Sequence, residues 1–555
     1  MYLNGGYVFK RADTSEEIEQ IHGLNYRTFV AEIPQHHDPG DGRLVDKFHA
    51  KNTYFIALRR GKVVGMISVH DQPPFSVADR LADATILSRP DSRPIEVRLL
   101  AIAPEQRKST VLMGLVWQFY EFARANGYTH AYLSGLEERI ALYRQFGFEP
   151  IGPAVRCGGA SFVPMGITIS QLVTVNEPKA KMWRKHLRRR GVLPSEPICL
   201  LPGPVMISAP VHAAFHQPPI YHRGPEFIEL FEKVRRNLAA MVRGRNVAVL
   251  NGSGTLANEV VAATLAAGPN PGAGVMLVNG EFGKRLARQA ERFGLRPRVL
   301  TWPWGEPWDL DQIDAVLAQE PSGSWILGVH QESSTGVLND LPGLVEVARK
   351  HGIRVCADCI SSLGAVPLDL SDVYIATAAS GKSIGAYAGA AIIFADARKL
   401  TGLDTSRVPS YFDLTAALAC RGTRYTFPSP TLLALDAALA GYAAPDAALS
   451  CYDRYAALGD YVRAQLRRLG LEPLAAEECA APVVTTFAPP AGESAEAFVA
   501  RCRLWGYEIG GQSGYLAERR LVQIATMGAV TRDICAPLFA HLENALVTRP
   551  EFATA

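Results

Sequence analysis

An aspartate and a lysine are placed unusually within one apolar stretch of the chain. Asp358 lies in the predicted strand 354–360, and Lys382 follows a second short apolar strand, 372–377, at a small-residue turn. Burying either charge costs free energy, so such residues usually have a partner. Pyridoxal phosphate needs a carboxylate to keep its ring nitrogen protonated and a lysine amine to react with its aldehyde. The pair suits that cofactor, although a surface-capped acid with a loop lysine is the simpler alternative.

Three predicted strands before this stretch end in polar or glycine-rich turns. The first, 246–250, leads into the turn 251–255 at a helix start, which suits a phosphate. The second, 275–278, is followed by Phe282, which could stack on a flat ring. The third ends in the polar run 330–336. Strands that alternate with helices predict a mainly parallel α/β sheet, whose strand ends form one crevice.

These segments resemble the class V, fold-type I aminotransferases that use pyridoxal phosphate, in particular the alanine–glyoxylate, serine–pyruvate and 2-aminoethylphosphonate aminotransferases. The matching motifs run in order from Leu201-Pro-Gly-Pro to Ser380-Gly-Lys. The resemblance implies that Lys382 forms the Schiff base and then carries the proton, and that Asp358 holds the ring nitrogen. It also implies a homodimer, because Thr426 resembles a residue that contacts the neighbouring subunit's phosphate. The implied cofactor contacts are Ser253, Gly254, Thr255, Phe282, Ser334, Asp358, Lys382 and Thr426.

The likeness breaks at the position that would bind the substrate's anion. Family members that take amino acids or phosphonates use an arginine in an Arg-Ile-Gly segment, whereas Gln523 stands there in this chain. Glutamine has neither the charge nor the fork geometry of a guanidinium. Either another cation takes over, or the substrate carries no anion at that point. The candidate cations are Arg424, Arg223 and Arg519.

The first 172 residues show a different pattern. Strand 94–102 runs through a turn into the helix 111–126, and a later helix, 137–145, ends in Phe-Gly-Phe. A helix that starts directly after a strand offers backbone amides to a pyrophosphate. The pattern resembles the GNAT acyltransferase fold, a mixed α/β domain. The segments 24–32 and 45–48 are similar to the N-acyl amino acid synthase and autoinducer synthase branch of that fold.

That resemblance implies acyl transfer to an amine from an acyl-CoA or acyl-carrier-protein thioester. The thioester would contact Arg107, Lys108 and Ser109, but this turn has no glycine, and Thr110 and Leu112 could crowd a pyrophosphate.

Two residues of this domain are candidates for acid–base chemistry. Tyr143 stands where many of these enzymes keep the general acid for the departing thiol, and it could equally be a packing residue. Glu96 could deprotonate the acceptor amine directly or through water, or could simply face solvent on its strand.

Between the two domains, residues 173–197 form a basic linker. Seven cations crowd this segment, which favours either a solvated helix or a docking patch for an acidic partner such as acyl carrier protein. They are Lys179, Lys181, Arg184, Lys185, Arg188, Arg189 and Arg190. The remainder, 198–555, is the aminotransferase-like domain, with a large part at about 215–440 and a small α/β lobe at about 441–550.

Composition sets outer bounds on partners and compartment. A net charge of +3 over 555 residues implies no general attraction to nucleic acid. The sequence shows no apolar run long enough for a membrane span or a signal peptide, and nine scattered cysteines suit a reducing cytoplasm. Cys356 and Cys359 form one isolated CxxC, which favours core packing over a metal site.

We therefore predict a bifunctional enzyme. Its C-terminal domain would transaminate an oxo compound, using a small-molecule amino donor, and its N-terminal domain would N-acylate an amine. A lyase or desulfurase reaction is the first alternative, although Gly381 stands where class V desulfurases usually keep a histidine before the lysine. In the second alternative, the N-terminal domain is only a binding or regulatory module.

Overall fold

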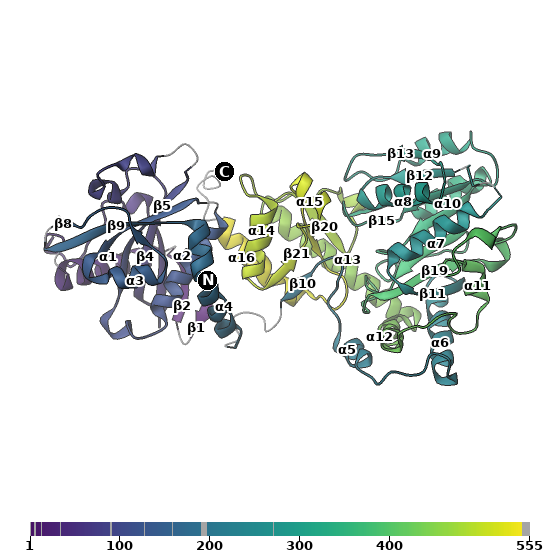
Figure 1. The fold of residues 1–555 in the computed structure, drawn as a ribbon, viewed down its shortest axis with the longest axis horizontal. Coiled ribbons are helices and arrows are strands. Elements are labelled where there is room, and N and C mark those ends of the chain that lie inside the picture. The colour runs from purple at the N-terminus through teal and green to yellow at the C-terminus, as the bar shows by residue number, and fades with distance from the viewer. Residues whose placement is uncertain are drawn as a thin grey trace. The chain divides into compact units, whose positions relative to one another are not determined.

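The computed structural model describes residues 2–4, 7–12, 14–33, 35–88, 92–126, 128–157, 159–189, 197–269, 271–272 and 274–546. It divides into two compact units, which are considered one at a time (Figure 1). The N-terminal unit comprises Met1–Pro197 with Leu504–Gly506. The C-terminal unit comprises Ile198–Arg503 and Tyr507–Ala555.

The described part of the N-terminal unit is built on a nine-stranded sheet. Its order is β1-β2-β3-β4-β5-β6-β9-β7, with β8 paired to β9, and only β5 and β6 run parallel. The strands are β1 (Tyr2–Asn4), β2 (Tyr7–Arg11), β3 (Thr53–Arg59), β4 (Lys62–His70), β5 (Pro94–Ile102), β6 (His130–Leu136), β7 (Glu149–Pro150), β8 (Val155–Cys157) and β9 (Ala160–Thr168).

Strands β5 and β6 separate along their length. Their pairing begins at Pro94 and His130 and ends at Val97 and Leu133, although both strands continue beyond that point. Leu99, just past the last pair, has φ at 47°, a strained value for a residue with a side chain. Beyond the last pair, the facing edges of the two strands are no longer hydrogen-bonded to each other.

Thr14 caps the first helix of the N-terminal unit and makes a capping box with Glu17. The helix continues directly as a π-helical segment. The described helices are α1 (Ser15–Tyr26), the π-helix η1 (Arg27–Glu32), α2 (Val111–Ala125), α3 (Ile140–Gln145) and α4 (Ile169–Arg189), with short 3-10 turns η2 (His49–Lys51), η3 (Ser76–Arg80), η4 (Ala84–Leu87), η5 (Pro104–Gln106) and η6 (Glu137–Arg139).

The C-terminal unit contains a seven-stranded, mainly parallel sheet in the order β11-β19-β18-β17-β14-β12-β13. Only β19 runs antiparallel to its neighbours. The strands are β11 (Asn246–Gly252), β12 (Gly274–Val278), β13 (Arg298–Thr301), β14 (Trp325–Val329), β17 (Arg354–Asp358), β18 (Ile375–Ala379) and β19 (Gly389–Ala395). The mainly parallel sheet confirms the predicted α/β class. Strand β18 lies slightly later than the predicted 372–377.

Alternate residues of each strand face two different apolar cores. In β11, Val247 and Val249 enter one core, while Ala248 and Leu250 enter the other. This period of two places a helix layer on each face of the sheet. Helices α6 (Pro225–Met241), α9 (Leu310–Leu317), α10 (Leu341–Lys350) and α12 (Ser429–Leu439) pack into the first core; α7 (Gly254–Ala266), α8 (Glu281–Arg292) and α11 (Leu414–Ala419) pack into the second.

The small lobe carries the two-stranded pairs β10 (Ile198–Leu200) with β21 (Tyr507–Ile509) and β20 (Val484–Phe487) with β22 (Val522–Ala525). A further short pair joins β15 (Gln331–Glu332) to β16 (Val337–Leu338). The remaining helices are α5 (Ala209–Phe215), η7 (Ala397–Lys399), η8 (Thr405–Arg407), η9 (Ala440–Tyr442), α13 (Pro445–Arg468), η10 (Glu477–Cys479), α14 (Ala495–Leu504), α15 (Gly514–Arg519) and α16 (Arg532–Leu546).

Within the described ranges, no single helix is both long and apolar enough to cross a membrane. The segment Ser429–Tyr442 with Pro445–Arg468 reaches that length and composition only as a pair, across a bend of 92°.

Candidate active sites

Lys382 lies in the turn that follows β18. Its Nζ donates a hydrogen bond of 2.6 Å to the carbonyl oxygen of Pro202. Burial lowers the pKa of Lys382 to about 8, with the charge of Asp358 opposing this shift and that of Arg285 adding to it. A Cβ atom at Gly203 would stand 3.3 Å from this Nζ, so the glycine keeps the amine uncrowded. The lysine is therefore a buried amine that becomes a free nucleophile at mildly alkaline pH.

Asp358 ends β17 and is 5% exposed. Its carboxylate accepts hydrogen bonds from Asn258 Nδ2 at 2.8 Å and from the Ile360 amide at 2.9 Å. Asn258 is itself fixed by Thr377 Oγ1 at 2.7 Å. Burial raises the pKa of Asp358, and these hydrogen bonds and the charge of Lys382 oppose the shift. Sequence reasoning missed Asn258, whose role depends on α7 packing beside β18.

The predicted phosphate turn lies at the first residues of α7. Ser253 is the extended residue before the helix, and both Ser253 and Thr255 are exposed. A Cβ atom at Gly254 would come within 2.5 Å of the Ile360 side chain, so the helix start approaches the segment after Asp358 closely. Amides at such a helix start bind phosphate. Together with a buried carboxylate and a buried amine, this turn fits pyridoxal phosphate.

Phe282 and Ser334 lie together at the start of α8. Phe282 is half-buried and meets Tyr515 edge-on at 6.2 Å between ring centroids. Ser334 Oγ donates to Glu332 Oε1 at 2.5 Å and accepts from the Glu281 amide at 2.9 Å. The hydroxyl of Ser334 thus joins α8 to the buried Glu332, and its expected place near the cofactor's phenolic oxygen stays a prediction.

Glu332 is fully buried. Burial raises the pKa of its carboxyl group, while hydrogen bonds from Ser334 and from the Gly283 amide oppose the shift. Burying a carboxylate without hydrogen bonds costs free energy, and the donors around Glu332 offset that cost by bonding to it. Sequence reasoning did not assign this role, because the donors come from a different strand–helix unit.

Gln523 is also fully buried. Its Nε2 donates to the carbonyl oxygens of Ser333 at 2.5 Å and Ser334 at 3.1 Å, and to Thr486 Oγ1 at 2.8 Å. The protein's own acceptors occupy its Nε2 group, whereas its Oε1 is buried without a hydrogen-bond partner among the described residues. Gln523 joins the small lobe to the segment that anchors α8.

The three cations expected to replace the missing arginine are either bonded within the protein, packed on an aromatic ring or exposed. Arg424 donates to the carbonyl oxygen of Ser410 at 2.9 Å and lies over Tyr425. Arg519 lies 4.0 Å over the ring of Trp304, and Arg223 is exposed. Thr426, the residue assigned to a neighbouring subunit's phosphate, is exposed as well.

In the N-terminal unit, Glu96 is fully buried in β5. Its carboxylate meets His70 Nε2 at 3.0 Å, Ser76 Oγ at 2.6 Å and two backbone amides, those of Ser76 at 2.7 Å and Val77 at 2.8 Å. Burial alone would raise the pKa of Glu96, but the bonds from His70 and Ser76 outweigh it and hold the pKa below its usual range. This is neither the solvent-facing nor the proton-accepting setting expected from the sequence, and it favours a structural role.

The turn assigned to the thioester is also internally bonded. Arg107 makes a two-fold contact with Glu32, both hydrogen bonds measuring 2.5 Å. Ser109 Oγ accepts from the Val111 amide at 3.2 Å and donates to the Gln106 carbonyl, so its hydroxyl is bonded to the backbone on both sides. Lys108 is exposed. A thioester phosphate at this turn would therefore compete with Glu32 for Arg107.

Tyr143 packs on α3 against Gly135 of β6, where a Cβ atom would come within 2.6 Å of its ring. Burial raises the pKa of the Tyr143 hydroxyl, and a hydrogen bond with the backbone of Leu136 opposes the shift. Leu136 ends β6, one of the two strands that separate, so Tyr143 lies beside the part of β6 that is no longer paired with β5.

Sequence reasoning assigned no role to a polar cluster at the same opening. Arg98, the first residue of β5 past its pairing with β6, binds Asp46 Oδ1 at 2.8 Å and lies over Phe48. Its Nε and Nη1 are buried and have no hydrogen-bond partner among the described residues. Asp46 also accepts from Asn52 Nδ2 at 2.6 Å. Asp46 belongs to the segment 45–48 that carried the family resemblance, which is the signal that could have identified it.

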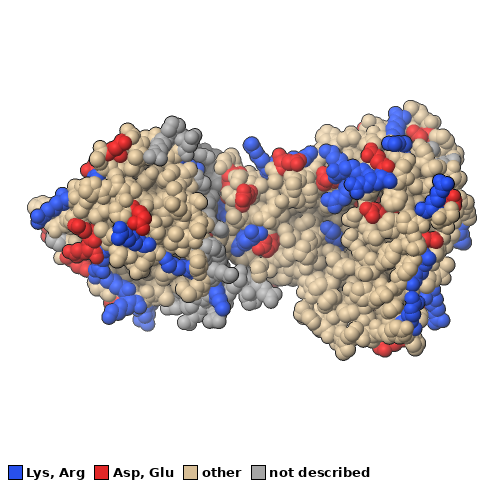
Figure 2. Space-filling model, viewed as in Figure 1, with Lys and Arg blue, Asp and Glu red and all other residues tan. Residues whose placement is uncertain are grey.

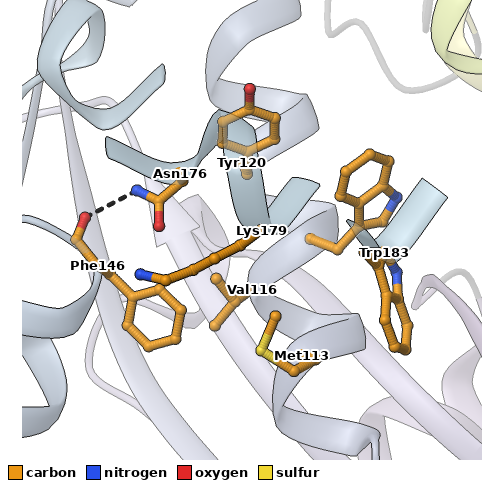
Figure 3. A pocket seen from close by; sticks show the side chains of 8 residues that line it. Met113, Val116, Tyr120, Phe146, Asn176, Lys179 and Trp183 are labelled. Atoms are coloured by element: carbon orange, nitrogen blue, oxygen red, sulfur yellow. Dashed lines mark hydrogen bonds between the residues drawn. The ribbon is translucent and has the colours of Figure 1, made fainter. Parts of the chain in front are cut away.

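A separate apolar hollow lies between α2 and α4 (Figure 3). Asn176 closes one side, with its Nδ2 donating to the Phe146 carbonyl at 2.9 Å. Lys179 lies with its ammonium 5.1 Å from the Phe146 ring centroid, so a cation sits at the edge of an aromatic lining. The residues are Met113, Val116, Trp117, Tyr120, Phe146, Asn176, Lys179 and Trp183.

Charged side chains on the face shown in Figure 2 alternate in small groups of both signs. Of the linker cations, Lys179 donates to the Gln145 carbonyl and Lys185 is exposed. Arg190 lies outside the described residues, as do the side chains of Lys181, Arg184, Arg188 and Arg189.

The described residues contain no cluster of three or more metal-ligating side chains, and burial raises the pKa of the Cys356 thiol to about 12.

Comparison with known proteins supports both halves of this picture. Residues 208–406 match the family "Aminotransferase class-V", and residues 20–168 match "N-acyl amino acid synthase FeeM". A 2-aminoethylphosphonate–pyruvate transaminase of Pseudomonas fluorescens is 30% identical over 349 residues, covering 60% of this chain and 92% of that protein. The corresponding protein of Pseudomonas putida is 29% identical over 351 residues, covering 61% of this chain and 93% of that protein.

Solved structures agree. An alanine–glyoxylate aminotransferase from Nostoc sp. matches with a TM-score of 0.58 and 29% identity, over 63% of this chain and 95% of that one. A pyridoxamine–pyruvate aminotransferase from Mesorhizobium loti shares the fold with a TM-score of 0.59 at 21% identity, over 64% and 94% of the two chains. The chain therefore belongs to the class V aminotransferases, enzymes of pyridoxal phosphate, and carries an N-terminal domain of the N-acyl amino acid synthase FeeM family.

Proposed function

We propose that this bifunctional architecture performs two consecutive reactions. The C-terminal unit would transfer an amino group from a small-molecule donor to an oxo compound. The N-terminal unit would acylate the resulting amine, or a related one, from a thioester. The observation that carries the first step is the buried pair of Lys382 and Asp358 beside the exposed start of α7. The fusion of the two domains in one chain motivates the second.

In the C-terminal unit, separate residues would bind the cofactor's phosphate, hold its ring nitrogen and transfer the proton. Bound pyridoxal phosphate supplies an aldehyde that accepts an amino group and a ring that withdraws electrons. The turn 253–255 would hold the phosphate, and Asp358, oriented by Asn258, would hold a proton at the ring nitrogen. Lys382, with a pKa of about 8, could release and regain a proton near neutral pH, as a general base and acid must.

In the N-terminal unit, the opening between β5 and β6 would admit the thioester's extended arm. Strand edges that no longer pair with each other can hydrogen-bond an extended chain. Tyr143 beside the opening would protonate the departing thiolate. Arg98, two of whose nitrogens have no partner in the described part of the chain, would contact a polar group of a substrate. The thioester would come from coenzyme A or from acyl carrier protein.

An isotope experiment tests the consecutive reactions. The purified protein would receive pyridoxal phosphate, a nitrogen-15-labelled donor (alanine or 2-aminoethylphosphonate), a panel of oxo acids and long-chain acyl thioesters of both carriers. Mass spectrometry should find an amide that contains the label. Lys382→Ala should abolish label transfer, while a ready-made amine is still acylated. If no thioester acylates the transamination product, the two steps are not consecutive.

The assembly and compartment follow from the same proposal. We expect a homodimer in which the exposed Thr426 completes the partner's phosphate site, to be checked by light scattering and by the cofactor affinity of Thr426→Ala. All nine cysteines are free in the structure, which suits the reducing cytoplasm.

A further inference from the structure

We propose that Arg285 on α8 binds the anionic group of the amino donor, in place of the arginine missing at position 523, and that the donor is therefore a small amino acid or aminophosphonate. This inference deepens the proposed transamination and rests on it. Its starting point is the location of the guanidinium, whose Cζ lies 4.8 Å from the ring centroid of Phe282. Phe282 is the aromatic residue assigned to the cofactor ring.

The guanidinium of Arg285 has no acidic partner within the described part of the chain. It is half-buried, and no described carboxylate oxygen lies within 4.0 Å of it. Neighbouring acids are already bonded: Glu281 pairs with Arg288 at 2.7 Å, and Glu332 accepts from the Gly283 amide at 2.9 Å. A partly desolvated cation without a counter-ion is costly, and an anionic ligand would offset that cost.

Hydrogen bonds through Gln523 and Ser334 hold the start of α8, the helix that carries Arg285. Gln523 binds the Ser334 carbonyl, and the Ser334 hydroxyl binds the first amide of α8, that of Glu281. Arg285 lies one helical turn further along α8. Gln523, which stands where related proteins have the anion-binding arginine, thus helps to fix α8, the helix that carries Arg285.

The charge of Arg285 also reaches the reacting groups. Burial is the main cause of the lowered pKa of Lys382, and Arg285 adds to it. The charge of Arg285 likewise opposes the rise that burial causes in the pKa of Asp358. A guanidinium presents parallel N–H groups that match a carboxylate or a phosphonate. A donor amine without an anionic group would make no such contact.

Titration of the holoenzyme tests this assignment. Wild type, Arg285→Gln and the matched control Lys284→Gln, an exposed cation on the same helix, would be loaded with pyridoxal phosphate. The change in the cofactor's visible band would be followed with 2-aminoethylphosphonate, alanine and propylamine. Loss of one charge-assisted contact should raise the half-saturating concentration of the first two by about 10- to 100-fold in Arg285→Gln. Propylamine and the Lys284→Gln protein should be unaffected.

Three results would overturn the assignment. The first is wild-type affinity of Arg285→Gln for both anionic donors, and the second is an equal loss of affinity for propylamine. The third is failure of Arg285→Gln to retain the cofactor at concentrations that saturate wild type, which would assign Arg285 to the cofactor's phosphate. Failure of the proposed function itself is distinguishable, because wild type would then respond to none of the three amines. Arg285→Lys, which keeps the charge, should recover part of the affinity.

Discussion

At the scale of single residues, Lys382 is the most informative group in the chain. A pKa of about 8 means that about a quarter of the amine is neutral at pH 7.5, against about one part in a thousand at the usual 10.5. Because only the neutral amine attacks an aldehyde, cofactor uptake by the apoprotein should rise with pH, reach half its maximum near the pKa of about 8 and level off at higher pH. Stopped-flow measurement of the visible band would show an inflection near pH 8. An inflection near 10.5 would mean that burial does not shift this lysine.

The sequence suggested that Glu96 acts as a catalytic base, whereas its buried hydrogen bonds predict a role in stability. The change Glu96→Gln would turn an acceptor that four donors face into a side chain with its own N–H groups. Such a mismatch should lower the free energy of unfolding of the N-terminal unit by about 1–3 kcal/mol. Urea denaturation measures this, with the exposed Glu105→Gln as control. Unchanged stability with abolished acyl transfer would restore Glu96 as the base.

Asp358 and Lys382 could be proposed as site residues from the sequence, because each is a charged residue within or next to an apolar strand and because the preceding strands end in polar or glycine-rich turns. Asn258, Glu332 and Arg285 could not, since their significance depends on which helix packs beside which strand. The hydrogen bonds that Ser334 and Gln523 make were not predictable for the same reason: a motif names a residue type but does not show which neighbouring groups that residue already bonds.

At the scale of elements, the start of α8 depends on a chain of buried hydrogen bonds. Gln523→Leu keeps the volume but removes the donor to the carbonyl of Ser333, so the C-terminal unit should lose about 1–3 kcal/mol of unfolding free energy. Urea denaturation of this variant beside the exposed Gln512→Leu would measure the difference. If Gln523→Leu were fully stable and only weakened donor binding, Gln523 would be a substrate contact after all.

The order of strands and helices was predictable because hydrophobic periodicity and capping residues are local. Thr14 with Glu17 and the alternating core of β11 both follow from neighbouring residues in the sequence. The π-helical segment η1 and the separation of β5 from β6 were not predictable, because they depend on long-range packing and on the strained backbone at Leu99.

At the scale of the whole molecule, the chain joins a family that makes amines to a family that acylates them. Covalent linkage raises the effective concentration of one domain's product near the other. This benefit requires that the transaminase be active, so the account depends first on the cofactor at Lys382.

The most direct measurement is therefore the visible spectrum of the purified protein with pyridoxal phosphate, before and after an amino donor is added. We predict a band in wild type that an amino donor bleaches and an oxo acid restores. Lys382→Ala should lack the lysine-dependent band, and Lys399→Ala, which alters an exposed lysine, should keep it. A wild-type protein that takes up no cofactor, or a Lys382→Ala protein with the full band, would contradict the account.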